Sequence, residues 1–138
     1  MSSDYFKSKS WFLPKTKDRP NRAWIHCQPY DYGVYVLWPA SGDLLKKEYT
    51  HAAKDDGADW PEGAFDISRG VYLTNGQHDC IAFKDDKPDP GIIAHEAYHY
   101  VCNLVRQLDL EGEEAPAYLI NYLTDRIYEL TRGKPCKV

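Results

Sequence analysis

Residues 91–108 read GIIAHEAYHYVCNLVRQL, and their apolar side chains recur at intervals of three and four. That spacing is typical of an α-helix with one apolar face. The face consists of Ile93, Ala97, Val101, Leu104, Val105 and Leu108. We therefore expect a long helix whose apolar face belongs to the core, with the remaining elements arranged around it.

The opposite face of this helix carries His95-Glu96-Ala97-Tyr98-His99, a motif of the form H-E-x-x-H. Histidines four residues apart stand about one turn, roughly 6 Å, from each other, so both imidazoles can reach one metal ion. Glu96 lies beside them, where its carboxylate can accept a proton from metal-bound water. With five histidines in 138 residues, a chance match is rare. The motif predicts a zinc site with His95 and His99 as ligands and Glu96 as general base.

A catalytic zinc site takes a third protein ligand besides two histidines and a water. The metzincin pattern requires a glycine three positions after the second histidine and another histidine six positions after it. Cys102 and Val105 occupy those positions, and the single methionine is Met1. The metzincin arrangement is therefore excluded.

The other common arrangement takes a glutamate from a following helix, and Glu111, Glu113 and Glu114 lie where the last helix is expected to begin. Acidic side chains are favourable at any helix N-terminus, so their presence alone proves little. Ala117 and Asn121 follow Glu114 on one helix face, and the small Ala117 would let this face approach the histidine helix. Helical spacing therefore favours Glu114 over Glu113 as the third ligand.

Two stretches, IIAHEAYHYV at 92–101 and EEAPAYL at 113–119, resemble the small zincin-type metallopeptidases encoded by tailed bacteriophages and prophages. The resemblance covers about residues 66–128. It implies a strand hairpin leading into the H-E-x-x-H helix, followed by a Glu-x-x-Ala-Tyr helix whose first residue, Glu114, is the third zinc ligand. The chain departs from the thermolysin-like pattern, which has an aspartate four residues after the ligand glutamate, because Tyr118 stands there.

A tyrosine hydroxyl near the metal could stabilise the oxyanion that forms during hydrolysis. Tyr98, Tyr100 and Tyr118 all lie close in sequence to the predicted ligands. With eleven tyrosines in the chain, a neighbouring tyrosine is expected from composition alone. We take Tyr118 as the candidate oxyanion-stabilising residue.

Four short runs rich in β-branched and aromatic residues predict strands. The runs at 23–27 and 34–38 flank a turn. Those at 69–74 and 79–84 surround the Asn-Gly pair at 75–76, which suits the left-handed torsions of a hairpin turn. A small, mostly antiparallel sheet is therefore expected.

Two further helices flank the sheet in the predicted order of elements. Ser41 can cap one that Gly57 ends, and the last helix starts near Glu113, tolerates Pro116 in its first turn and ends at Gly133. The result is an α+β, minimal zincin-like domain whose sheet packs on the H-E-x-x-H helix and the glutamate-bearing helix. We expect the earlier helix on the same side of the sheet.

Length and composition indicate one globular domain, since 43% of the 138 residues are hydrophobic and 28% are charged. Residues 1–21 show no sustained periodicity and carry an excess of Lys and Arg. They predict a flexible basic arm with at most a short pairing segment at 11–13, and residues 22–138 form the single metallopeptidase domain. Nucleic-acid binding by the arm is not favoured, because short charged ends are usually solvated.

The four cysteines, Cys27, Cys80, Cys102 and Cys136, show no C-x-x-C pairing. No apolar run near the start is long enough for a signal peptide or a membrane span. We therefore expect a cytoplasmic protein, in the host cytoplasm if it is phage-encoded as the resemblance implies. In that reducing setting the thiols are expected to act as small buried hydrophobes.

These observations predict zinc-dependent hydrolysis of a peptide bond, with a peptide or protein substrate held along an open edge of the hairpin at 69–84. The alternative is a zinc-stabilised phage binding protein that acts on a host or phage partner without catalysis. The two differ at the fourth coordination position, which an enzyme leaves open to water and a structural site closes. No oligomeric state follows from the sequence.

Overall fold

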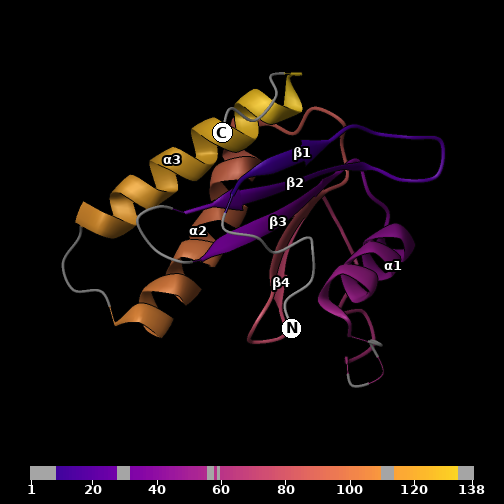
Figure 1. Ribbon diagram of the computed structural model, residues 1–138, viewed down its shortest axis with the longest axis horizontal. Coiled ribbons are helices and arrows are strands. Elements are labelled where there is room, and N and C mark those ends of the chain that lie inside the picture. The colour runs from indigo at the N-terminus through magenta and orange to yellow at the C-terminus, as the bar shows by residue number, and fades with distance from the viewer. Residues whose placement is uncertain (1–8, 28–31, 56–57, 59, 110–113, 134–138) are drawn as a thin grey trace.

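A computed structural model describes residues 9–27, 32–55, 58, 60–109 and 114–133 as one sheet with three helices around it (Figure 1). In chain order the elements are β1 (Trp11–Leu13), β2 (Asn21–His26), β3 (Gly33–Trp38), α1 (Gly42–Ala53), β4 (Gly70–Thr74), β5 (Asp79–Phe83), α2 (Pro90–Leu108) and α3 (Glu114–Thr131). The α+β class predicted from the sequence is confirmed.

The five strands lie in the order β1-β2-β3-β5-β4, which places β4 at one edge. The pairs β1 with β2, β2 with β3, and β4 with β5 are antiparallel, whereas β3 and β5 are parallel. Parallel neighbours need a crossover connection, and the segment that contains α1 provides it. The sheet is therefore mixed and mostly antiparallel, as predicted.

The hairpin of β4 and β5 forms where the sequence predicts it, with Gly70 paired to Phe83 and Thr74 paired to Asp79. Gly76 has a φ of +93°, a left-handed torsion that glycine adopts without strain. The side-chain oxygen of Asn75 accepts hydrogen bonds from the backbone N–H groups of Gln77 and His78, which closes the turn. This hairpin leads directly into α2.

Two hydrophobic cores lie on the two faces of the sheet, because alternate strand residues point in opposite directions. Ala23 and Ile25 belong to the core under α2 and α3, whereas Trp24 belongs to the core under α1. All six residues of β3 are buried. A central strand that is apolar on both faces needs a cover on each.

The helix α1 accordingly lies on the opposite side of the sheet from α2 and α3 (Figure 1), and the prediction that it shares their side is wrong. Its N-terminus is as expected, since the hydroxyl of Ser41 accepts a hydrogen bond from the backbone of Leu44. Its end comes before the predicted stop: α1 finishes at Ala53, and Lys54 adopts the left-handed conformation with φ 55°. Gly57 lies outside the described residues.

The helices α2 and α3 run antiparallel and share one core. A guanidinium nitrogen of Arg132, just after α3, donates to the carbonyl of Pro88, just before α2, at 2.7 Å. The end of α3 therefore lies against the start of α2. Their common core contains Ile93, Ala97, Val101 and Leu104 from α2 with Leu119, Leu123, Ile127 and Leu130 from α3.

The described part of the predicted N-terminal arm is tied to the domain. Residues Trp11–Leu13 form the edge strand β1, and the ring of Phe12 stacks on Trp38 at a centroid distance of 5.9 Å. Arg19 forms an ion pair of 2.6 Å with Glu48, which is only 3% exposed. Residues 11–13 therefore form the short pairing segment predicted there, and aromatic packing with a partly buried ion pair connects the described part of the arm to the domain.

Within the described residues, Cys27, Cys80 and Cys102 are free thiols, and the first two are buried. Burial raises the pKa of Cys27 to about 12, which makes that thiol a poor nucleophile. Cys136 lies outside the described residues. None of the helices in the described part is both long enough and apolar enough to cross a bilayer.

Candidate metal centre

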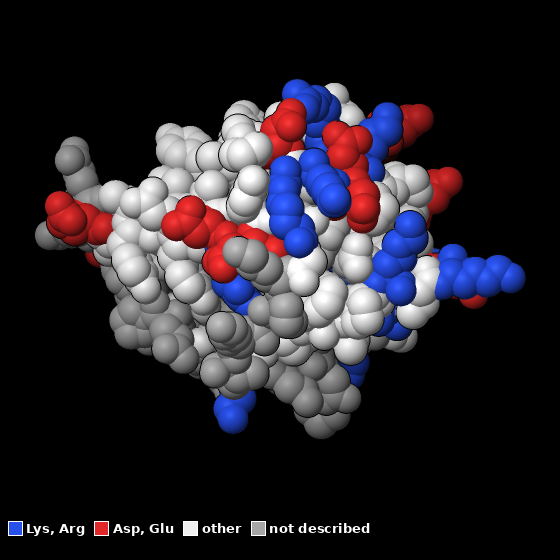
Figure 2. All heavy atoms as spheres, turned by 90° about the horizontal axis from the view of Figure 1, so that it is seen from above, with Lys and Arg blue, Asp and Glu red and all other residues white. Residues whose placement is uncertain are grey.

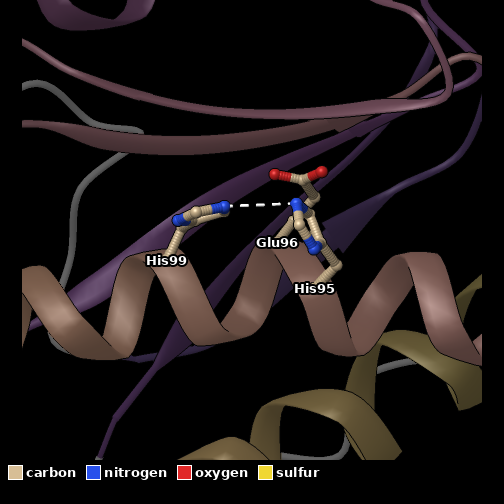
Figure 3. Close-up of side chains that lie close together, drawn as sticks. All are labelled: His95, Glu96 and His99. Carbon is tan, nitrogen blue, oxygen red and sulfur yellow. Dashed lines mark hydrogen bonds between the residues drawn. The ribbon is translucent and has the colours of Figure 1, made fainter.

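The structure brings His95, Glu96 and His99 together on α2 (Figure 3). The Nε2 atoms of the two histidines are 3.2 Å apart, and their rings lie nearly perpendicular, at 83°. One donor atom from each of the three residues lies within 4.8 Å of the others. Both histidines are exposed, whereas Glu96 is only 6% exposed.

This donor set fits a divalent metal ion. Two imidazole nitrogens bound at about 2.05 Å to a tetrahedral zinc ion stand about 3.3 Å apart, close to the observed 3.2 Å. The same separation also permits one hydrogen bond between the two rings, so the distance is compatible with zinc without requiring it. Imidazole and carboxylate ligands suit zinc and several other divalent ions.

Glu96 lies in the gap between α2 and the edge strand β4, and Gly70 makes this placement possible. A Cβ added to Gly70 would lie 3.1 Å from Cγ and 3.2 Å from Oε2 of Glu96, and 3.0 Å from Ile92. Ordinary carbon contacts are about 3.5–4.0 Å, so a side chain at this position would crowd the carboxylate. Sequence analysis assigned no role to Gly70, although glycine within a strand can mark a close approach.

The environment of Glu96 favours a proton acceptor. Burial raises the pKa of Glu96, and the neighbouring positive charges of His95 and His99 oppose that rise. A carboxylate whose pKa moves toward neutrality takes a proton more readily than an ordinary exposed one. The geometry therefore agrees with the role of general base predicted from the motif.

The buried carboxylate of Asp79, at the start of β5, connects a side chain of β4 to a side chain of α2. Asp79 is 6% exposed and accepts a hydrogen bond from the hydroxyl of Tyr72 at 2.5 Å. The side-chain amide of Asn103, one turn beyond His99 on α2, donates to the same oxygen at 3.4 Å. This network holds the edge strand against the helix, and nothing in the sequence pattern distinguishes Asp79 from the first residue of a strand.

Glu114, the predicted third ligand, is not part of the donor group on α2. It is the first residue of α3, and the antiparallel packing puts the start of α3 alongside the C-terminal half of α2. Two of the three ligands that the sequence predicts therefore lie within the group that the structure assembles, and Glu114 lies outside it. Among the described residues, the three on α2 form the one metal-binding group found, and Glu111 and Glu113 lie outside the described part.

The ring contact found for Tyr118 is with Tyr122, at a centroid distance of 6.2 Å, and not with either histidine. The hydroxyl of Tyr122 in turn donates to the carbonyl of His26 at the end of β2. In this sheet β3 and β5 separate β2 from β4, a distance of about 14 Å. The tyrosine that does contact the site is Tyr98, whose ring centroid lies 6.0 Å from that of His99.

No known protein family, curated protein or solved structure matches the chain. The functional interpretation therefore depends on the geometry of His95, Glu96 and His99, and the resemblance to phage zincin-type metallopeptidases stays a prediction.

Proposed function

We propose that this chain is a zinc-dependent hydrolase that cleaves peptide bonds. The observation that supports the proposal most directly is the 3.2 Å separation of the His95 and His99 Nε2 atoms, with the Glu96 carboxylate beside them at the edge of the sheet. Three chemically suitable donors converge there from a single helix. Their order on that helix is that of the H-E-x-x-H motif of zinc metalloproteases.

Each residue has a distinct role in the proposed reaction. His95 and His99 would hold the zinc ion, which when bound supplies Lewis acidity and lowers the pKa of a bound water. Glu96 would accept a proton from the attacking water and would then give that proton to the leaving amine. Its burial against Gly70 limits the positions open to the carboxylate.

The exposure of both histidines favours a catalytic site over a structural one. A structural zinc site is closed by four protein ligands, whereas a catalytic site keeps a position open to water. Within the described residues, the donors at the site are two imidazoles and the carboxylate of Glu96. A site held by these donors alone would leave a position for water, and it should hold zinc less tightly than a site with three protein ligands besides its water.

The edge strand β4 supports a peptide as the substrate. The carbonyl of Arg69 accepts a hydrogen bond from the backbone N–H of Lys84. In this antiparallel ladder, the backbone N–H and C=O groups of Arg69 and of alternate residues after it therefore point toward β5. The backbone groups of Gly70 and Tyr72 then point away from β5. An extended peptide paired with them would pass beside Glu96, because Gly70 contacts that side chain.

The charge distribution gives no support to nucleic-acid binding on the face shown in Figure 2. Lys and Arg side chains gather on one half of this face, but Asp and Glu side chains are interspersed among them. Nucleic-acid sites usually present a continuous basic surface. The peptide therefore remains the substrate class that the described geometry favours.

The replacement Glu96→Gln tests the proposal. Glutamine keeps the size of the side chain but does not accept the proton, so hydrolysis of a defined peptide mixture should fall about 10²–10⁴-fold. Zinc content and the thermal unfolding midpoint should remain near those of the wild type. A cellular effect that survives Glu96→Gln but disappears in His95→Ala would instead identify the zinc-stabilised binding protein.

A further inference from the structure

A small number of large apolar or aromatic side chains are exposed on the described surface. They are Leu13, Tyr32, Tyr98, Tyr118 and Tyr128. Tyr118 stacks on a neighbouring tyrosine, and Tyr128 lies under the guanidinium of Arg132 at 4.2 Å. Tyr98 differs from both because the ring that it contacts belongs to a predicted metal ligand, His99.

The position of Tyr98 on α2 places it on the opposite side of the histidine pair from Glu96. Each residue advances an α-helix by about 100°, so Glu96 and Tyr98 lie about 160° apart, with His95 and His99 between them. Glu96 contacts Gly70 on the β4 side. Tyr98 therefore borders the histidine pair on the side away from β4.

The ring of Tyr98 is 54% exposed and packs on one side against His99. The two ring centroids are 6.0 Å apart, and the ring planes meet at 62°. An accessible aromatic ring offers a large apolar surface and loses little conformational freedom when it binds another apolar group.

We propose that Tyr98 forms a subsite for an aromatic or large apolar side chain of the substrate, next to the scissile bond. The inference rests on the proposed peptidase function. A peptide paired with β4 alternates its side chains between the two faces of the sheet, and those on the α2 face extend across the histidine pair. A side chain beside the scissile bond then meets Tyr98, with which an aromatic ring can pack at 4.5–7 Å, the range usual for aromatic pairs.

The experiment uses the zinc-loaded protein and a peptide mixture containing all residue types on both sides of many bonds, with cleavage sites identified by mass spectrometry. Wild-type protein should prefer Phe, Tyr, Trp or Leu next to the cleaved bond. Tyr98→Ala should lose this preference and raise KM for a phenylalanine-containing peptide about tenfold, with little change in kcat. Tyr98→Phe keeps the ring and should keep the preference.

Tyr128→Ala is the matched control, because Tyr128 is an exposed tyrosine on α3 that contacts Arg132. It should cleave like the wild type. Cleavage without an aromatic or apolar preference, or a preference that survives in Tyr98→Ala, would overturn the subsite and leave the peptidase proposal standing. Absence of any zinc-dependent cleavage by wild-type protein would overturn both.

Discussion

Replacing Gly70 with alanine adds one methyl group where β4 approaches α2. The new Cβ would lie 3.0 Å from Cγ2 of Ile92 and 3.2 Å from Oε2 of Glu96. Ordinary contacts of about 3.5–4.0 Å would require a relative movement of roughly 0.5 Å. The movement must come from β4, from the Ile92 side chain or from the Glu96 carboxylate.

The expected loss of stability is small. Overpacking costs about 1–3 kcal/mol, and replacing a strand glycine by alanine returns about 0.5–1 kcal/mol, so the net loss should be about 1 kcal/mol. The same substitution should have a clearer effect on the rate of hydrolysis than on folding stability. A displacement of about 1 Å can reduce a rate about 100-fold, so about half that displacement should reduce turnover roughly tenfold.

Chemical denaturation of the metal-free protein measures the loss of stability, and hydrolysis of the peptide mixture measures the loss of turnover. Gly91→Ala is the control, because an added Cβ at Gly91 meets no atom within 4 Å and should stabilise the helix slightly. If Gly70→Ala matches Gly91→Ala in both stability and turnover, Glu96 is not confined by β4 in the way described.

Two further predictions follow from the same geometry. Glu114→Ala should leave zinc retention in a chelator competition unchanged, because Glu114 is not among the donors that the structure groups with the two histidines. Marked loss of zinc would restore Glu114 as a ligand and contradict this assignment. Burial raises the pKa of Asp79, and hydrogen bonds such as that from Tyr72 oppose this rise. The folded state therefore holds this proton more tightly than the unfolded state, and wild-type stability relative to Asp79→Asn should increase as pH falls through the raised pKa toward 3.8. Unfolding curves in which this difference shrinks as pH falls would contradict the assignment.

The sequence predicted the elements whose signals are local. The three-and-four spacing of Ala97, Val101 and Leu104 located α2, and H-E-x-x-H identified the cluster that the structure assembles. The Asn-Gly pair located the hairpin, because a tight turn depends on torsions within a few residues. These features need no knowledge of distant neighbours.

The features that the sequence did not predict depend on tertiary packing. Helical spacing could rank Glu114 above Glu113, but it did not show that Glu114 stays outside the donor group on α2. Burial of β3 on both faces left no alternation to indicate on which side α1 packs. The roles of Gly70 and Asp79 likewise arise from the contact between β4 and α2.

Zinc stoichiometry tests the central claim most directly. Equilibrium dialysis against a buffered zinc solution should give about one bound zinc per chain for the wild type. His95→Ala and His99→Ala should each lose it, whereas His51→Ala, a change on the exposed face of α1 across the sheet, should retain it. Equal zinc content in all four proteins would show that His95 and His99 do not bind the metal.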